Sequence, residues 1–198
     1  MIFKKYIVIE RKFSNMKITE VSKFLALILR HKPEELGLTL DKEGWCNTEK
    51  LVNAFANKFN GFTMETLEEI VSTDNKGRYA FNKDKTLIRA VQGHSTKCVD
   101  ITFEEVDLEP MRDKLFHGTG EKYVESILLQ GLIPKSRQYV HLSDNYNTAI
   151  KVGQRHGKPV VFKINVDNLK KHGIKLYKSE NSVYLAKTVP ADCLEKML

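Results

Sequence analysis

Residues 77–91 read GRYAFNKDKTLIRAV, two short runs of mainly apolar residues separated by the polar stretch NKDK. Runs of this length, interrupted by a cluster of Asn, Asp and Lys, are typical of two strands joined in a hairpin. Before this stretch, apolar residues recur at helical spacing, and after it the pattern predicts alternating strands and helices. The hairpin therefore divides the chain into two halves of different character.

Three amphipathic helices are predicted before the hairpin. The first runs from Thr19, as N-cap, to about His31, because its apolar residues recur at helical spacing. The second and third begin at the N-caps Asn47 and Thr63. Three helices followed by a hairpin form the winged-helix arrangement. Such domains bind nucleic acid or serve as protein-contact modules, and the pattern leaves both functions open.

The second half is predicted to mix strands and helices. The stretch DITFEEVDLEPMRD is acidic and contains a proline, which favours a linker. Beyond it, apolar strands such as KLFHGT alternate with a helix that ends at Gly131 and a helix with Asp144 as N-cap. We therefore predict an α+β chain with an N-terminal extension (1–18), a winged-helix lobe (19–99), a linker (100–113) and a mixed-sheet lobe (114–198).

The composition is that of an ordinary soluble globular protein, with 41% hydrophobic and 29% charged residues. A net charge of +7 favours a polyanionic partner such as nucleic acid. Three widely spaced cysteines fit a reducing compartment and lack metal-ligand spacing. The sequence contains neither a signal-peptide core nor an apolar run long enough to span a membrane. We expect a cytoplasmic monomer with no membrane association and no bound metal.

Several common nucleotide-binding and catalytic motifs are absent from the sequence. There is no phosphate-binding loop, and Tyr123 stands where the third glycine of a dinucleotide-binding motif would follow Gly118 and Gly120. The motifs of zinc proteases and serine hydrolases are missing too. These absences disfavour a Rossmann site and most hydrolase and kinase functions.

Several arginines have two interpretations. Residues 29–33, LRHKP, place Arg30 and His31 in the last helical turn, where the helix dipole would favour each cation by roughly 0.3–1 kcal/mol. Arg89 lies in an otherwise apolar strand, where it either pairs with an acidic residue at a sheet edge or binds an anion. Arg155 could equally be a cation at a helix C-terminus. The alternative for all of them is phosphate binding, to which the guanidinium fork is suited.

The histidines favour a shared site. Five of the six have arginine, glycine or hydroxyl-bearing neighbours. In FHGT and VHLS, His117 and His141 end apolar strands, where sheets present ligand-binding groups. Any one of these histidines could simply lie in the core, but their recurrence in one context favours a common function.

Six blocks of the sequence resemble the RNA 2′-phosphotransferases of the KptA type, in the same order along the chain. They are SKFLALILRHKPEELGLTLDKEGW, IRAVQGHS, LFHGTGEKYVESILLQGLIP, RQYVHLS, VGQRHGKPVV and ENSVYLA. The resemblance covers roughly residues 20–190. It leaves out the first 15 residues, so Met16 is an alternative start. Ser182 stands where the family is expected to have glycine, and Lys135 and Ser136 precede Arg137 in a variable loop.

The resemblance implies a fold, a reaction and a set of site residues. The second lobe would have an ADP-ribosyltransferase-like fold and bind NAD. An internal RNA 2′-phosphate, such as that at a tRNA splice junction, would be transferred to NAD, releasing nicotinamide and ADP-ribose 1″,2″-cyclic phosphate and leaving a 2′-hydroxyl. The implied catalytic residues are Arg30, His31, Arg89 and Arg155. The implied NAD-binding residues are His117, Gly118, Thr119, His141, Leu142, Ser143 and Val183. The implied RNA-binding residues are Arg30, His31, Lys32, Arg89, His94, Ser95 and Arg137.

Two other functions fit parts of the pattern. An ADP-ribosyltransferase that leaves ADP-ribose on a nucleic-acid phosphate or a protein would keep the HGT and HLS stretches, but it would not need Arg30 and Arg89 together. A non-catalytic, basic RNA-binding module would need neither stretch. Release of nicotinamide from NAD that depends on a 2′-phosphorylated RNA would distinguish these functions.

Overall fold

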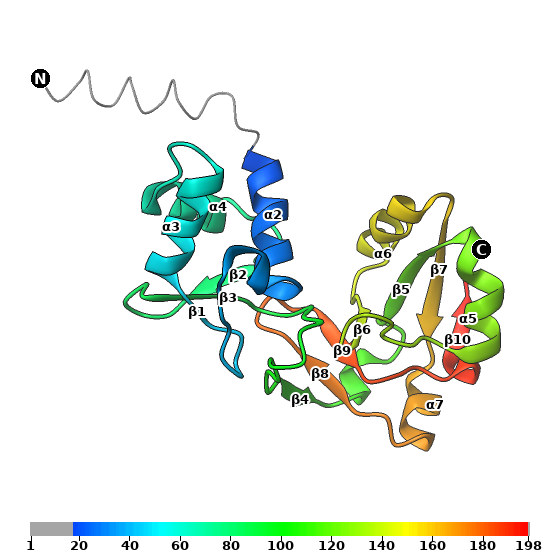
Figure 1. The fold of residues 1–198 in the computed structure, drawn as a ribbon. Coiled ribbons are helices and arrows are strands. Elements are labelled where there is room, and N and C mark those ends of the chain that lie inside the picture. Colours follow the sequence, from blue (N-terminus) through cyan, green and yellow to red (C-terminus); the bar gives the residue numbers. More distant parts are fainter. Residues whose placement is uncertain (1–17, 198) are drawn as a thin grey trace, which may run out of the picture. The chain divides into compact units, whose positions relative to one another are not determined.

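The computed structural model describes residues 18–197 (Figure 1). The chain divides into two compact units, and the boundary between them in the sequence lies between Thr102 and Phe103. Each unit has helices and small antiparallel sheets, so the chain is mixed α/β, consistent with the predicted α+β class. The expected N-terminal extension lies, apart from Ile18, outside the described residues. Within residues 18–197, no helix has the length and apolar character needed to cross a membrane.

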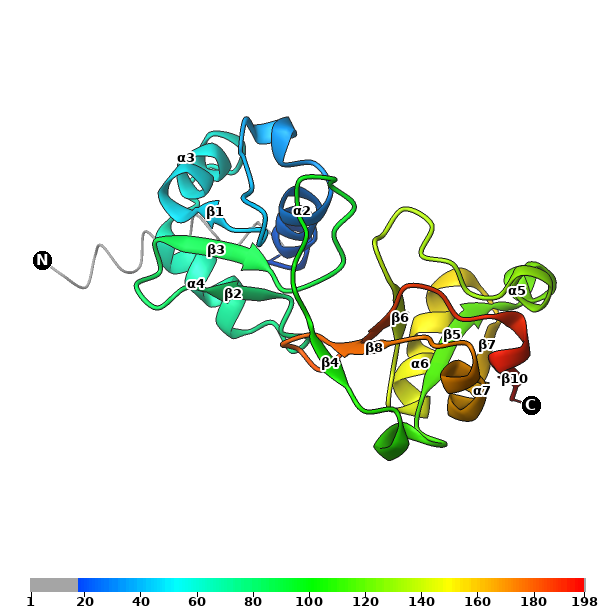
Figure 2. The same cartoon turned by 90° about the horizontal axis from the view of Figure 1, so that it is seen from below.

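The described part of the first unit, residues 18–102, contains three helices and a three-stranded sheet. Its helices are α2 (Ile18–Arg30), α3 (Thr48–Lys58) and α4 (Met64–Ser72), with a short 3-10 helix at Pro33–Leu36. Strands β1 (Cys46–Asn47), β2 (Tyr79–Phe81) and β3 (Leu87–Ala90) form an antiparallel sheet in the order β1-β3-β2 (Figure 2). The predicted helices and hairpin are thus confirmed, whereas β1 was not expected.

Local side-chain chemistry explains where these helices begin. The side chain of Asn47 accepts a hydrogen bond from the backbone N–H of Lys50, and Thr63 caps α4 in the same way. The expected cap at Thr19 is wrong, because α2 already includes Ile18 and Thr19 lies in its first turn. The apolar faces of the three helices meet the sheet in a core that includes Leu25, Leu51, Phe55, Leu67 and Ile88.

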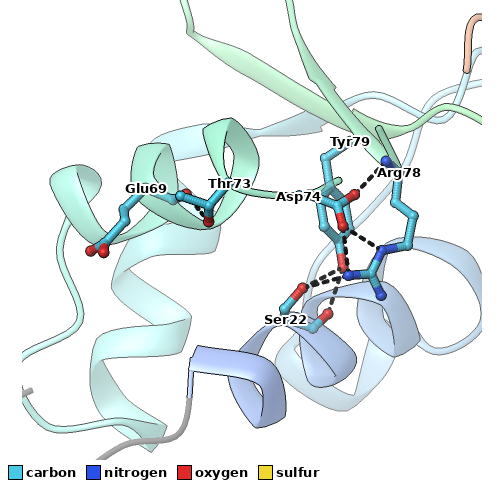
Figure 3. A network of polar contacts seen from close by, with 6 residues as sticks. All are labelled: Ser22, Glu69, Thr73, Asp74, Arg78 and Tyr79. Carbon is cyan, nitrogen blue, oxygen red and sulfur yellow. Dashed lines mark hydrogen bonds and ion pairs between the residues drawn. The ribbon is translucent and has the colours of Figure 1, made fainter. Parts of the chain in front are cut away.

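A polar network fixes α2 to the start of β2 (Figure 3). The Tyr79 hydroxyl donates to the backbone oxygen of Ser22 at 2.5 Å, and Arg78 Nη2 donates to Ser22 Oγ at 3.1 Å. Arg78 is held in turn by the side chain of Asp74, whose Oδ1 lies 2.7 Å from Nη2. Burial opposes both charges, but the Arg78 guanidinium lowers the pKa of Asp74. The Asp74 carboxylate in turn raises the pKa of Arg78.

Tyr79→Phe is expected to lower the free energy of unfolding by about 1–2 kcal/mol, because it removes a buried hydroxyl and its hydrogen bond to Ser22. Urea unfolding followed by the fluorescence of Trp45, which lies in the same unit, measures the change. Tyr177→Phe serves as the control, because Tyr177 is only half buried. An equal loss in both variants would show that the network does not stabilise the first unit.

The second unit contains two antiparallel sheets. One has the order β10-β7-β5, formed by β5 (Phe116–Gly120), β7 (Pro159–Ile164) and β10 (Leu194–Lys196). The other has the order β4-β8-β9-β6, formed by β4 (Glu104–Val106), β6 (Val140–Leu142), β8 (Leu176–Lys178) and β9 (Tyr184–Ala186). Reciprocal backbone hydrogen bonds between Phe116 and Ser143 connect β5 to the end of β6.

Three helices complete the second unit: α5 (Val124–Gln130), α6 (Tyr146–Gly153) and α7 (Val166–Lys171). Short 3-10 helices lie at Glu109–Met111, Glu121–Tyr123, Gln154–His156 and Ala191–Cys193. α6 packs against β5 and β7 (Figure 2). The core combines residues from both sheets and from the helices, among them Leu115, Phe162, Ile164, Leu169, Leu176 and Ala186.

The structure differs from expectation at several places in this unit, two of which are a segment expected as a linker and a helix N-cap. The segment expected as a linker, 100–113, contains β4, which pairs with β8, and Met111, which is buried in the core. The N-cap of α6 is Asn145 and not Asp144: its side chain accepts from the backbone N–H of Thr148. Asp144 is displaced from the cap because Ser143, held by its bridge to Phe116, accepts the N–H of Asn145 at Oγ.

Candidate functional site

Arg30, His31, Arg89 and His94 lie together in the first unit, and we call them the arginine–histidine cluster. Arg30 is the last residue of α2 and is 9% exposed. His31 follows it in a half-buried position, and Nδ1 of its ring lies 2.9 Å from Ser95 Oγ. The structure therefore brings together four residues that the sequence analysis assigned to RNA binding or catalysis.

Arg89 lies on β3, the middle strand of its sheet, so the edge position in one alternative is wrong, whereas the acidic partner it expected is present as Glu43. Its guanidinium carbon lies 4.4 Å from the centre of the Trp45 ring, and Nη1 donates to the backbone oxygen of Glu43 at 3.2 Å. The Glu43 carboxylate lies 3.7 Å from the same Nη1 and is largely exposed. Trp45 and Glu43 thus orient a guanidinium whose side chain is 13% exposed.

His94 is buried among these cations. Its residue is 2% exposed, and its pKa is lowered to about 4 by burial and then by repulsion from Arg30, His31 and Arg89. A hydrogen bond to the backbone of Leu29 opposes that shift. His94 is therefore neutral at physiological pH, and its side chain is enclosed within the first unit.

Stability of the first unit is expected to fall as the pH is lowered through the range in which His94 titrates. An unfolded histidine titrates near 6.5, whereas the folded pKa is about 4, so between these values the unfolded chain alone binds the proton. The contribution of His94 to the free energy of unfolding is complete above the pKa of the unfolded state. It decreases by about 3 kcal/mol as the pH falls to the pKa of the folded state. Urea unfolding at a series of pH values, followed by Trp45 fluorescence, measures this loss. If His94→Asn kept the same pH dependence, the loss would have another origin.

The remaining predicted RNA-binding residues have different surroundings. Lys32 is exposed and forms an ion pair with Glu35 at 2.7 Å. Arg137 belongs to the second unit and lies near Arg155. Loss of hydration, and then repulsion from Arg155, lower the pKa of Arg137. Parts of both residues remain exposed, and their proximity makes them a second cationic pair, separate in the sequence from the arginine–histidine cluster.

Most of the residues expected to bind NAD lie within β5 and in or just after β6. His117 is the second residue of β5 and His141 the middle residue of β6, so the expectation that these histidines end their strands is wrong. His117 Nδ1 is 3.1 Å from the backbone oxygen of His141. Burial lowers the pKa of His117, with a smaller contribution from repulsion by His156. Thr119 is buried, and the side chain of Leu142 belongs to the apolar core.

The turn before β9 carries Ser182, one of the residues expected to differ from the family pattern. Ser182 has a φ of 59°, a left-handed conformation that favours glycine. The neighbouring Val183 is held there by its backbone N–H, which donates to Ser179 Oγ at 3.1 Å. A serine therefore occupies a position whose backbone geometry explains why glycine was expected.

Gly118 has a packing function within β5. A Cβ atom at this position would lie 1.7 Å from the backbone oxygen of Ala149 in α6. Glycine at this position therefore lets α6 lie close against the strand. The glycine assigned to NAD binding from the sequence is thus required by the fold of the second unit.

Gly118→Ala is expected to destabilise the second unit by about 3 kcal/mol or more, because α6 must move away from β5. Urea unfolding followed by far-ultraviolet circular dichroism measures the change. Gly173→Ala is the matched control, because a Cβ there meets nothing within 4 Å and only its φ of 65° opposes the substitution. Similar stabilities of the two variants would contradict the close contact.

One group of side chains outside these sites has metal-ligand chemistry. Ligand atoms of His172, Asp192 and Cys193 lie within 4.8 Å of one another. His172 already forms an ion pair with Asp192 at 2.8 Å, and Cys193 is buried, with its pKa raised to about 11 by burial. This ion pair accounts for the group, and we assign no metal to it.

A family profile and several relatives match most of the chain. The sequence profile described as RNA 2′-phosphotransferase, Tpt1 / KptA family, matches residues 16–188. The chain belongs to this family. Its membership makes the protein an enzyme of the transferase class. The matched range contains both the arginine–histidine cluster and the residues around His117.

Individual relatives are similar over nearly their whole length. The probable RNA 2′-phosphotransferase of Escherichia coli O6:K15:H31 (strain 536 / UPEC) is 42% identical over 93% of this chain and 98% of its own. A protein of the same name from Pectobacterium carotovorum subsp. carotovorum (strain PC1) is 44% identical over 92% of this chain and 96% of its own. The RNA 2′-phosphotransferase of Escherichia coli (strain K12) is 40% identical over the same shares as the first.

Sequence reasoning missed the residues that hold the cluster in place. Trp45 and Glu43 contact Arg89 from a loop far away in the sequence. Gly93 has a φ of 89° and packs against the Arg30 side chain: a Cβ atom added to Gly93 would lie 3.5 Å from Arg30 Nε. The stretches EGW and QGHS contain these residues, but neither has a local pattern that marks its residues as partners of an arginine.

Proposed function

We propose that the chain is an NAD-dependent RNA 2′-phosphotransferase in which the arginine–histidine cluster receives the RNA 2′-phosphate. The observation that carries this assignment is the convergence of Arg30, Arg89 and His31 around a buried, uncharged His94. Two guanidinium groups held by packing provide fixed cations for a phosphate dianion. Family membership supports the transferase activity and an RNA substrate.

The first chemical step is attack of a 2′-phosphate oxygen on the nicotinamide-bearing carbon of NAD, with loss of nicotinamide as a neutral base. The difficulty is to bring an anionic nucleophile into line beside an anionic dinucleotide. Arg30, Arg89 and Arg155 would orient the phosphate and offset its charge, which contributes several kcal/mol where water is excluded. His117, Gly118, Thr119, His141, Leu142, Ser143 and Val183 would form the NAD site.

The second step resolves the ADP-ribosylated RNA phosphate. The ribose 2″-hydroxyl attacks the phosphorus, the bond to the RNA 2′-oxygen breaks, and a proton passes from the attacking hydroxyl to the departing oxygen. His31 would assist this proton transfer, because imidazole titrates near neutrality. The products are 2′-hydroxyl RNA and ADP-ribose 1″,2″-cyclic phosphate.

The finer organisation belongs to the same proposal. Residues 19–99 would form a winged-helix lobe that binds RNA, and residues 114–198 an ADP-ribosyltransferase-like lobe, in a cytoplasmic monomer without a metal. The three helices, the hairpin and the two small sheets are consistent with these lobes. Lys32, which is basic, and Ser95, which carries a hydroxyl, lie beside the cluster in the first lobe and would contact the RNA. Arg137 of the second unit would bind a neighbouring RNA phosphate.

Nicotinamide release tests this function. The full-length protein is incubated with NAD and an oligonucleotide carrying an internal 2′-phosphate, a 2′-hydroxyl or a 5′-phosphate. We expect nicotinamide and cyclic-phosphate ADP-ribose only with the 2′-phosphorylated RNA. Stable ADP-ribose on a 5′-phosphate or on protein, without cyclic phosphate, would instead indicate an ADP-ribosyltransferase. No release with any substrate would indicate a non-catalytic RNA-binding module.

A further inference from the structure

At the C-terminal end of α2, the backbone oxygen of Leu29 lacks the N–H donor that a regular helix would provide. In a regular helix the backbone oxygen of Leu29 would accept from the residue four positions on, but that residue is Pro33, which has no N–H group. The oxygen is nevertheless satisfied, because the His94 side chain hydrogen-bonds to the backbone of Leu29. Since His94 Nε2 has no hydrogen-bond partner among the described residues, Nδ1–H is the donor.

The residues on either side of His94 contact the neighbouring residues of the helix end. The backbone N–H of Ser95 donates to the oxygen of Arg30 at 3.0 Å, and Ser95 Oγ lies 2.9 Å from His31 Nδ1. Gly93 packs against the Arg30 side chain. The segment 93–95 therefore fixes the backbone of the last turn of α2 and the two side chains that this turn presents.

The surroundings of the His94 ring favour an uncharged side chain of this size. The ring is buried between Arg30, His31 and Arg89, so a protonated imidazole would add a fourth cationic group. On its far side lies Gly44, with a φ of 79°, where a Cβ would come within 3.0 Å of Nε2. The ring thus fills the space between the loop at Gly44 and the helix end.

We propose that His94 is a positioning residue, whose Nδ1–H group holds the last turn of α2 so that Arg30 and His31 face the substrate phosphate. Its burial separates it from direct contact with RNA, the function predicted for it from the sequence. This inference rests on the proposed function of the arginine–histidine cluster. It assigns the histidine a role through Arg30 and His31, and not through contact with either substrate.

Two amide variants test this role. The amide nitrogen of Asn at position 94 reaches the place of Nδ1, whereas the amide of the longer Gln reaches the place of Nε2 and leaves Leu29 unsatisfied. We expect His94→Gln to lower kcat on the order of 10²-fold, the cost of a small displacement of catalytic groups, while the KM for NAD stays unchanged. His94→Asn should recover most of this activity. His172→Gln, at an exposed histidine, is the control.

Circular dichroism and Trp45 fluorescence verify that both variants are folded. Wild-type kcat in His94→Gln, or equal losses in the Asn and Gln variants, would overturn the inference. A loss shared between kcat and the KM for NAD would overturn it too, because it would indicate general disruption of the fold. Arg30→Ala is measured in parallel: if Arg30→Ala is active, both the inference and the proposed site fail. If Arg30→Ala is inactive while His94→Gln is normal, only the inference fails.

Discussion

Replacing Arg30 or Arg89 with alanine is expected to lower kcat about 10³-fold while leaving the fold intact, and the same result is expected for Arg155. Arg30 and Arg89 are largely buried, so each would act on the phosphate where much of the water is excluded and one fixed donor contributes about 10²–10³-fold or more. Arg155 is exposed, and the same loss is expected there because it would supply a further guanidinium to the phosphate. The two cationic side chains of the first unit are held by packing before substrate arrives: Arg30 beneath Gly93, and Arg89 against the Trp45 ring.

Lysine should not restore the activity at these positions. The planar guanidinium of Arg89 stacks on Trp45 and donates to the Glu43 backbone, and the flexible ammonium group of lysine cannot reproduce both contacts. Single-turnover assays of Arg89→Ala and Arg89→Lys at saturating NAD measure the effect. Arg112→Ala is the control, since Arg112 is exposed and paired with Asp167 at 2.7 Å. Near-normal activity in any one alanine variant would show that this arginine does not bind the phosphate.

His31→Ala is expected to stop the reaction after the first chemical step. Nicotinamide leaves as a neutral base, so formation of the ADP-ribosylated RNA phosphate gains little from proton transfer. The second step exchanges one alkoxide for another, and general acid–base catalysis contributes on the order of 10²–10⁴-fold there. The variant should therefore consume NAD and accumulate RNA that carries ADP-ribose on its 2′-phosphate.

Rapid-quench gel electrophoresis detects that intermediate as a band of lower mobility. Ser95→Ala provides a graded comparison, because it removes the hydroxyl 2.9 Å from His31 Nδ1 and should give a weaker accumulation. His172→Ala should behave as wild type. If His31→Ala is blocked before nicotinamide release and no band appears, His31 binds the attacking phosphate together with the arginines and does not transfer the proton.

Much of the fold could be predicted because it depends on residues close together in the sequence. The caps at Asn47 and Thr63 each bind a backbone N–H three residues on, and the hairpin strands flank their own turn. The strands β1, β4 and β10 were missed because they are two or three residues long and are defined by partners far away in the chain. The expected cap at Asp144 is wrong because a contact of Ser143 with β5 leaves Asn145 at the N-cap position of α6.

The candidate site, like the fold, has one part that the local sequence could predict and another that depends on tertiary contacts. The sequence pattern indicated Arg30 and His31 because a proline ends their helix, and it indicated Arg89 because this residue interrupts an apolar strand. Their grouping with His94 follows from tertiary contacts, and so does the packing of Trp45 on Arg89. No local pattern could show that His94 is buried and uncharged, because its surroundings come from α2, from β3 and from the loop at Gly44.

The most direct test of the account is a binding cycle that removes the phosphate and an arginine separately and together. Affinities of the wild-type protein and of Arg89→Ala are measured without NAD, for one oligonucleotide with an internal 2′-phosphate and the same oligonucleotide with a 2′-hydroxyl. The wild type should prefer the phosphorylated RNA by roughly 10-fold or more, and Arg89→Ala should lose that preference while binding the 2′-hydroxyl RNA almost as well as the wild type. An equal preference in both proteins would contradict the claim that the arginine–histidine cluster receives the 2′-phosphate.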